Sequence, residues 1–172
     1  MCSLAYQLGW RKQELLRLER HQLDLELGTR RLEPGTTKNH QGRTAFLRPE
    51  LRQLLAAQVE RVRGLERRTG SICRWLFPYL EGPYRGQRIS DFRKSWKTAC
   101  RAAGVPGRLF HDFRRTAVRN MLHRGVTEKV TMGVAGHLSR RVFDRYAIVA
   151  SSDLQEVARR TPSAVERRPA SL

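Results

Sequence analysis

Leucines at helical spacing dominate the start of the chain and limit what it can fold into. They recur at intervals that place them on one face of an α-helix, at Leu4, Leu8, Leu15 and Leu18. Gly9 falls inside this pattern, so the spacing predicts either one continuous helix or two short helices bent near that glycine. Either form has to pack its leucine face against a larger core.

Arg11 stands among these leucines. In a continuous helix it would occupy the middle of the leucine face. A buried guanidinium without a partner is costly, and Glu14 is three residues further on, where an i,i+3 contact forms. Arg11 is therefore either a paired structural arginine or a positioned clamp for an anion.

The rest of the chain predicts an α+β fold that is mainly α, in one domain. A strand-prone region over 23–32 and 43–47, with a Pro34-Gly35 turn and a loop over 38–42, predicts a small antiparallel sheet with a hairpin. Start and stop signals predict further helices over 49–68, 91–103, 111–123 and 127–134, and one beginning at Ser139 that carries Tyr146.

The charge is strongly positive and uneven. The 172 residues include 34 Lys and Arg against 16 Asp and Glu, a net charge of +18. Residues 85–124 hold 11 basic and two acidic residues, so half of the net charge lies in this stretch. Arginine predominates, and its planar fork grips phosphate. The partner expected is a nucleic acid; the alternative is coding bias and solvated helix faces.

Other features of the sequence narrow the class of protein. No apolar stretch is long enough to span a membrane, and the first residues lack the pattern of a secretory signal. Three widely spaced cysteines without a C-x-x-C pair do not suggest disulfides or a zinc ribbon. We therefore expect a cytoplasmic protein with no membrane partner.

Several residues have the chemistry of an anion site. His111 and Arg114 sit three apart at a predicted helix start, close to the positive end of its dipole. His137 follows Gly136 in a predicted turn. Tyr146 is either a core aromatic or a nucleophile, and Lys38 is either a solubilising hairpin lysine or a functional one.

The sequence lacks the motifs of two kinds of phosphate chemistry, metal-dependent cleavage and nucleotide binding. The acidic residues are scattered, without the D-x-D or H-E-x-x-H pairing of metal sites, and there is no G-x-x-x-x-G-K loop for a nucleotide. The sequence thus predicts no metal, no nucleotide and no other cofactor. Two arginines, a lysine and two histidines beside a phenol are the groups that a mechanism based on fixed cations would use.

In their order along the chain, these positions resemble the tyrosine recombinase family, also called phage integrases. The matching pieces are Gly9-Trp10-Arg11-Lys12-Gln13-Glu14-Leu15, Thr37-Lys38-Asn39, His111-Asp112-Phe113-Arg114-Arg115-Thr116, Gly136-His137 and Asp144-Arg145-Tyr146. The resemblance implies a helical catalytic domain with a small antiparallel sheet, acting on double-stranded DNA in site-specific recombination or integration.

The resemblance also implies a role for each residue. Tyr146 would attack the scissile phosphate and form a 3′-phosphotyrosyl link, with His111 assisting the proton transfer and Lys38 protonating the leaving 5′ oxygen. Arg11 and Arg114 would hold the non-bridging oxygens and His137 would add a hydrogen bond, with Glu14 orienting Arg11. Further contacts to DNA are expected from Arg43, Arg93, Lys94, Lys97, Arg115 and Arg140.

The resemblance further suggests how the chain is divided. We expect residues 1–150 to be the catalytic domain, without the N-terminal core-binding domain usual in the family, and 151–172 to be a C-terminal helix and flexible tail. A homo-oligomer, a tetramer on paired sites, is expected, with 153–160 as a docking segment. The alternatives are a non-enzymatic DNA-binding protein or inactive remnant with a helix-turn-helix-like segment over 112–134, and a monomeric type IB topoisomerase.

Overall fold

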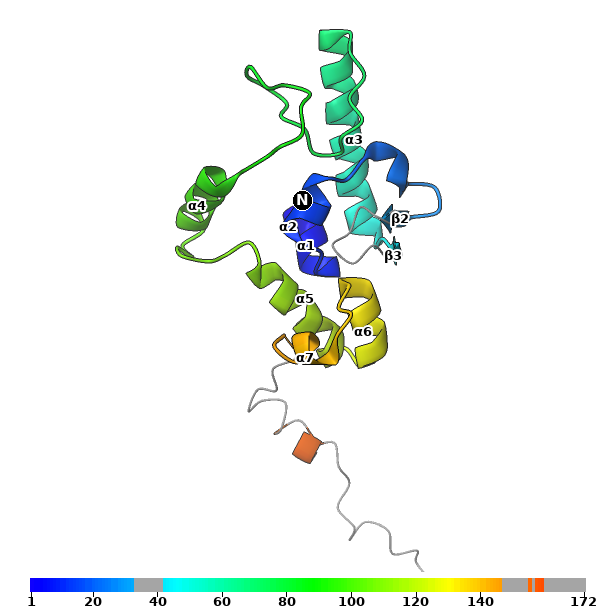
Figure 1. Cartoon of the computed structure of the whole chain (residues 1–172), viewed down its shortest axis with the longest axis vertical. Helices are drawn as coiled ribbons and strands as arrows, with labels where there is room; N and C mark the ends of the chain where they lie inside the picture. The colour runs from blue at the N-terminus through cyan, green and yellow to red at the C-terminus, as the bar shows by residue number, and fades with distance from the viewer. Residues whose placement is uncertain (33–41, 147–154, 156, 160–172) are drawn as a thin grey trace, which may run out of the picture.

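The computed structural model describes residues 1–32, 42–146, 155 and 157–159, and it is mainly helical with one small sheet (Figure 1). The predicted fold class, α+β and mainly α, is confirmed. The elements are α1 Cys2–Leu8, α2 Lys12–Leu16, η1 Arg20–Gln22, β1 Leu23–Asp24, β2 Thr29–Leu32, β3 Arg43–Phe46, α3 Pro49–Thr69, α4 Arg93–Ala102, α5 Asp112–His123, α6 Glu128–Ala135 and α7 Arg140–Phe143.

The chain begins with two short helices, and the continuous-helix alternative is wrong. Helix α1 ends at Gly9, whose φ of 67° is the left-handed conformation that glycine adopts without steric cost. Arg11 is extended, with φ −70° and ψ 149°, and immediately precedes α2. Arg11 therefore lies at the bend between the helices rather than within a leucine face.

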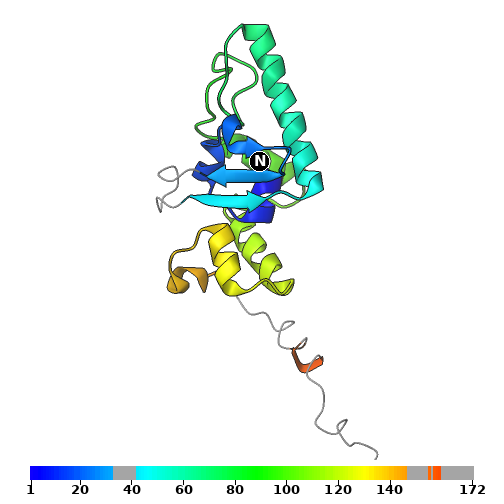
Figure 2. The same ribbon diagram turned by 90° about the vertical axis from the view of Figure 1, so that its right-hand side faces the viewer.

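The sheet is antiparallel, as predicted, but the region over 23–32 is two strands rather than one. β1 pairs with β2, and β2 pairs with β3, in the order β1-β2-β3 (Figure 2). Between β1 and β2 the Asp24 carboxylate accepts the Leu27 N–H at 2.8 Å, and Gly28 has a φ of 64°. This Asp side chain and this glycine form a turn that the sequence prediction did not include.

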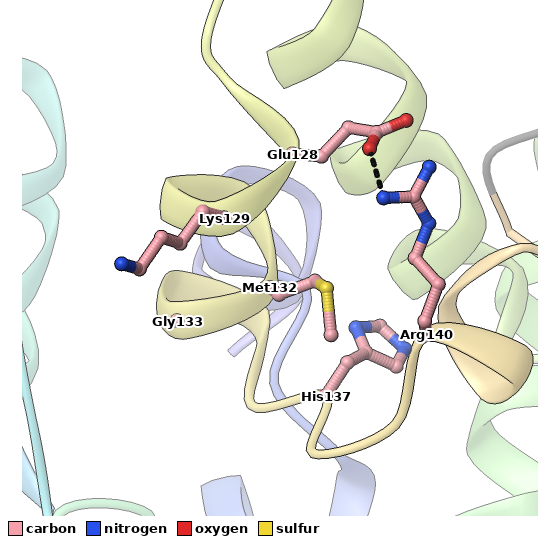
Figure 3. Close-up of a pocket in the computed structure, with 6 residues that line it drawn as sticks. All are labelled: Glu128, Lys129, Met132, Gly133, His137 and Arg140. Carbon is pink, nitrogen blue, oxygen red and sulfur yellow. Dashed lines mark ion pairs between the residues drawn. The ribbon is translucent and has the colours of Figure 1, made fainter.

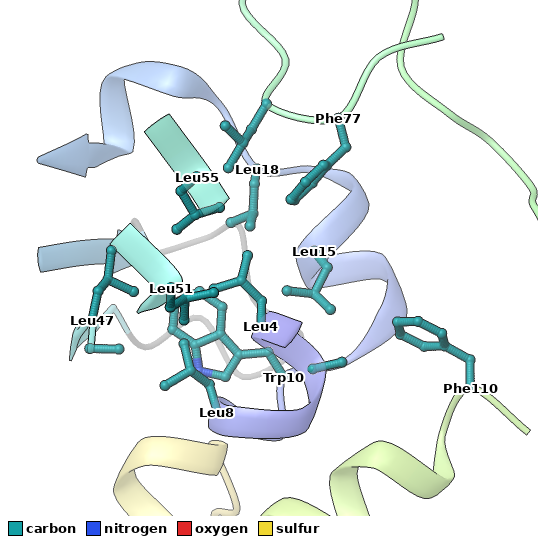
Figure 4. Close-up of a cluster of buried hydrophobic side chains, with 13 residues drawn as sticks. Leu4, Leu8, Trp10, Leu15, Leu18, Leu47, Leu51, Leu55, Phe77 and Phe110 are labelled. Carbon is teal, nitrogen blue, oxygen red and sulfur yellow. The ribbon is translucent and has the colours of Figure 1, made fainter. Parts of the chain in front are cut away.

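The core joins the two N-terminal helices to the long helix α3. Leucines of α1 and α2 point toward leucines of α3, and Trp10 and Phe77 close the cluster (Figure 4). Pro49 occupies the first turn of α3 and Gly70 ends it, close to the predicted range of 49–68. Within the described residues no helix is long and apolar enough to cross a membrane.

Helix α4 lies to one side of this core, between two extended connections (Figure 1). It begins at Arg93, two residues after the predicted start, because Asp91 remains outside the helix and its carboxylate accepts the Arg93 N–H at 3.0 Å. Only Cys100 of this helix is buried. Trp96, at its inner face, packs against Phe110 and Phe113.

Helices α5 and α6 form the other end of the molecule and follow the predicted ranges closely. α1 packs on α5, and α5 on α6, so the N-terminal residues come next to the segment that leads to Tyr146. The last helix is shorter than predicted: α7 ends at Phe143, and Tyr146 lies in the turn that follows, where its N–H donates to the Phe143 carbonyl at 2.7 Å.

Candidate functional site

The C-terminal end of α6 brings distant parts of the chain together. Gly136, with a φ of 71°, ends this helix in the left-handed conformation. The carbonyls of the last turn of a helix have no partner within it. Here the Trp10 indole N–H donates to the carbonyl of Val134 at 2.9 Å. The bend after α1 is thereby fixed to the end of α6.

The Arg114 side chain donates to further carbonyls at this end of α6. Its side chain is 2% exposed, and one terminal nitrogen donates to the Gly9 carbonyl at 2.6 Å and to the Ala135 carbonyl. The other terminal nitrogen donates to the Gly136 carbonyl at 3.3 Å. The negative end of the α6 dipole stabilises the buried positive charge, and the charge is held in one place by backbone atoms.

His137 completes the surroundings of Arg114. The Arg114 Nε–H donates to His137 Nε2 at 3.2 Å, so Nε2 is an acceptor and the imidazole is neutral in this arrangement. His137 is 5% exposed and its ring contacts two aromatic rings, with centroid distances of 5.5 Å to Phe143 and 4.8 Å to Tyr146. The sequence predicts His137 as a phosphate ligand, and the structure shows it as a direct partner of Arg114.

Arg11 lies beside Arg114 but is more accessible, with 27% of its side chain exposed. The buried Glu14 carboxylate accepts the Arg11 backbone N–H at 2.8 Å and its guanidinium at 3.1 Å, which is the contact expected from the spacing. The same guanidinium nitrogen donates to the Gly136 carbonyl at 3.4 Å. One carbonyl oxygen thus contacts both arginines.

Tyr146 and His111 form the outer part of the site. The Tyr146 hydroxyl lies 2.7 Å from His111 Nε2, and the Arg114 guanidinium carbon lies 5.6 Å from the Tyr146 ring centroid. Burial lowers the pKa of His111 below its ordinary 6.5, and the charges of Arg114 and Arg11 act in the same direction. A neutral His111 is able to accept the proton of the phenol.

The structure therefore brings together Arg11, Glu14, His111, Arg114, His137 and Tyr146. Lys38 lies outside the described residues. A phenol next to a neutral imidazole and two fixed positive charges is suited to attack an anionic centre and to stabilise the charge that develops there.

The residues predicted to contact DNA lie outside this cluster. Arg93, Lys94 and Lys97 are exposed on α4, Arg115 is exposed on α5, and Arg43 begins β3. Arg140 has ion pairs with two carboxylates, Glu128 at 2.7 Å and Asp144 at 3.2 Å. Its pairing links α7 to α6 in addition to any contact it makes with a ligand.

Arg140 also lines a hollow beside His137. The cavity has a volume of about 550 Å³, and Figure 3 shows two of its lining residues, Met132 and His137, near each other and the ion pair between Glu128 and Arg140. His137 thus has Tyr146 and Phe143 against its ring and this open space nearby.

The sequence did not predict the backbone partners of the arginines, namely the carbonyls of Gly9, Ala135 and Gly136. It also did not predict the bond from the Trp10 indole to the Val134 carbonyl. Every residue has a backbone carbonyl, so the sequence does not indicate which carbonyls will accept from an arginine. The only local signal was Gly136 at the predicted end of a helix, since a left-handed C-cap leaves carbonyls pointing away from the last turn.

A family model, described as the phage integrase family, matches residues 1–152. The chain belongs to the phage integrase family. A curated relative, the integrase of Salmonella phage P22, is 25% identical over 170 residues, which cover 94% of this chain and 41% of the P22 protein. This phage integrase chain therefore spans less than half the length of that relative.

Solved structures share the fold of this phage integrase family member. XerA recombinase superposes with a TM-score of 0.72 at 19% identity, over 93% of this chain and 57% of that one. XerH recombinase bound to palindromic difH substrate gives 0.68 at 19%, over 91% and 43%. The Tn1549 transposon integrase in complex with circular intermediate DNA gives 0.66 at 16%, over 93% and 56%.

Proposed function

We propose that this chain is the catalytic domain of a site-specific DNA recombinase, in which Tyr146 cuts and rejoins strands. The observation that carries the proposal is the 2.7 Å contact between the Tyr146 hydroxyl and His111 Nε2, beside the fixed charge of Arg114. Membership of the phage integrase family supports the same reaction.

The proposed step transfers a phosphate from one oxygen to another. The Tyr146 oxygen attacks phosphorus while the bond to the 5′ oxygen breaks, which leaves a 3′-phosphotyrosyl link. The phenol proton passes to His111 Nε2, and Lys38, by its resemblance to the family's lysine, protonates the leaving 5′ oxygen. Rejoining is the reverse, so the step consumes no nucleotide.

The two arginines have different tasks in this proposal. Arg11 is 27% exposed and presents its guanidinium to the non-bridging oxygens. Arg114 is buried and supplies a positive charge whose position is set by backbone carbonyls before substrate arrives. His137 holds the Arg114 Nε–H and contacts the Tyr146 ring, so it aligns the clamp with the nucleophile.

Double-stranded DNA is the proposed partner. Its phosphates would lie along the exposed basic residues of α4 and continue to the site at His111, which follows α4 in the chain. We further propose residues 1–150 as the catalytic unit, 151–172 as a C-terminal helix and tail, a tetramer on paired DNA sites, and a cytoplasmic location.

The test is to trap the covalent link. A pool of nicked duplexes with randomised sequence would be incubated with the chain, and adducts resistant to denaturant would be isolated, sequenced and mapped by mass spectrometry. We expect the nucleotide on Tyr146, with no adduct from Tyr146→Phe and full yield from the control Tyr84→Phe, an exposed tyrosine away from the site. An adduct that persists in Tyr146→Phe would refute the proposed nucleophile.

A second candidate is a DNA-binding protein without catalysis. It is favoured by the packing of α5 against α6 across the turn at Gly125, which resembles a helix-turn-helix. The same pool separates the two: sequence enrichment without any covalent product supports this candidate. Relaxation of supercoiled plasmid without sequence preference would instead indicate a topoisomerase.

A further inference from the structure

His111 also lines a second cavity. It has a volume of about 380 Å³ and lies between α2 and the start of α4. Aromatic side chains make up much of its wall, from Phe92, Trp96 and Phe110, and His111 forms part of it. Lys12 and Arg93 contribute positive charge to the lining.

The aromatic wall of this cavity is held in place by packing. Phe110 meets the rings of Phe92 and Trp96 edge to face, with centroids 5.1 and 5.3 Å apart. The Trp96 indole N–H donates to the Arg108 carbonyl at 2.7 Å, which fixes the orientation of the ring. The cavity is thus a preformed aromatic slot.

The positive charge around the cavity favours a negatively charged ligand such as a nucleic-acid strand. Lys12 lies 5.6 Å from the Phe92 ring centroid, so one cation is directly at the aromatic wall. Arg93 is 80% exposed and begins a helix with no acidic residue in it, whose basic residues are Arg93, Lys94, Lys97 and Arg101. Asp91 pairs with Arg93 and approaches Lys12 at 4.0 Å, which offsets part of this charge.

We propose that this cavity binds one nucleobase, unstacked from the DNA, next to the phosphate that Tyr146 attacks. The proposal rests on the proposed function. His111 links the two sites, because the same side chain lines the cavity and contacts the Tyr146 hydroxyl. Aromatic faces beside cations are the usual receptor for an unstacked base and its phosphates.

Such a site would contribute to the choice of the cleavage position. Extruding a base is least costly where its pairing or stacking is weak. A strand whose flanking base enters the slot would be held with its phosphate at Tyr146, whereas a base that stays stacked would leave the slot empty. The chain would thus read how easily the DNA deforms beside the nick.

The test fills the cavity from a residue that is already exposed. Leu109 lines the cavity and is 66% exposed, so Leu109→Trp adds a ring there without removing a buried contact. On the duplex sequence obtained from the adduct pool, we expect Leu109→Trp to lower adduct yield on the order of tenfold. The matched control, Leu27→Trp at a 74% exposed position in the β1–β2 turn, should have no effect.

An abasic series then identifies the occupant. The base at each position flanking the nick would be removed in turn, and we expect one position at which Leu109→Trp and the wild type give equal yields, because no base is left to be accommodated. Phe92→Leu, which removes one aromatic face, should show the same positional rescue. Thermal unfolding of each variant would verify that it is folded.

Two results would overturn this proposal and leave the proposed function intact. One is normal adduct yield from Leu109→Trp on intact DNA. The other is a defect that no abasic position relieves, which would show that the occupant of the cavity is not a base. Absence of any adduct from the wild-type chain would instead contradict the proposed function.

Discussion

Arginines are used in two different ways at the α6 end and on α4. Arg114 is 2% exposed and donates to backbone carbonyls from two distant segments. Arg93 is 80% exposed, and its partner is the neighbouring Asp91. The position of the Arg114 charge is set by distant parts of the fold, whereas the Arg93 charge is exposed and has a partner two residues away.

This difference has an electrostatic consequence. A charge in a water-poor environment acts on its neighbours far more strongly than the same charge at the surface, where salt screens it within about 10 Å. The α6 end is therefore suited to stabilising one transition state, and α4 to attracting many phosphates. Net charge alone does not separate these two uses.

Arg114→Ala is expected to have the largest combined effect, because it lowers both the stability and the rate. It removes the Arg114 donor from the Gly9, Ala135 and Gly136 carbonyls, which should lower the free energy of unfolding on the order of 3 to 5 kcal/mol. Adduct formation should fall roughly 10²- to 10³-fold in the folded fraction. Arg101→Ala on α4 is the control for both chemical denaturation and adduct yield. Equal losses of stability and adduct yield in the two variants would show that buried and exposed arginines do not differ in role.

Gly9→Ala tests whether the backbone holds Arg114 in place. Gly9 has a φ of 67°, and an added Cβ would lie 3.2 Å from the Ala117 Cβ. Strain and crowding together should cost about 1 to 3 kcal/mol and slow adduct formation, since the Gly9 carbonyl accepts from Arg114.

Gly70→Ala is the matched control for that substitution. Gly70 has a nearly equal φ of 66°, but nothing lies within 4 Å of the added Cβ. The variant should show the strain in thermal unfolding and leave the rate of adduct formation unchanged. If it slowed the reaction as much as Gly9→Ala, the carbonyl would not be positioning Arg114.

The pH dependence tests the neutral state of His111. Because burial lowers the pKa of this group, its neutral form persists below pH 6.5. The rate of adduct formation should therefore stay high as pH falls through 6.5 and drop only at lower pH. The stability that this depressed pKa contributes is present above pH 6.5 and is lost as pH falls through the folded-state pKa.

His111→Gln should remove the fall in rate at low pH and lower the rate roughly 10²- to 10⁴-fold at neutral pH. His21→Gln, at an exposed position, is the control and should keep the fall in rate at low pH.

The smallest effect is expected on α4. Lys94→Gln and Lys97→Gln each remove one exposed charge, and should each reduce the slope of log affinity against log salt by about 0.9 without changing the melting temperature. Filter binding over a salt series would measure this, with Lys129→Gln on α6 as the control. A change in melting temperature or an unchanged slope would show that α4 is not simply a phosphate contact.

Much of the fold was predictable because its signals are local. Pro49 and Gly70 bracket α3, and Gly125 and Gly136 bracket the α6 region, so short-range chemistry sets these ends. The turn between β1 and β2 escaped prediction because it depends on one Asp24 side chain and one glycine within a leucine-rich stretch.

The sequence predicted which residues come together in the cluster, but not how they are arranged there. His111, Arg114, His137 and Tyr146 were found through motif order and resemblance. The burial of Arg114 depends on a contact with Gly9 that spans 105 residues, and no periodic pattern encodes it. The place of Tyr146 beyond α7 was missed because its spacing from Ser139 fits a longer helix equally well.

The Trp10 contact with Val134 spans 124 residues, and that of Arg11 with Gly136 spans 125. Loops of this size close late, after local helices have formed, because their closure entropy is lost before the contact repays it. A partly folded chain would already carry the α4 charges but not the clamp. Under the proposed function, such a molecule would hold DNA without cutting it, and Tyr146 would become reactive only once these long-range contacts had closed.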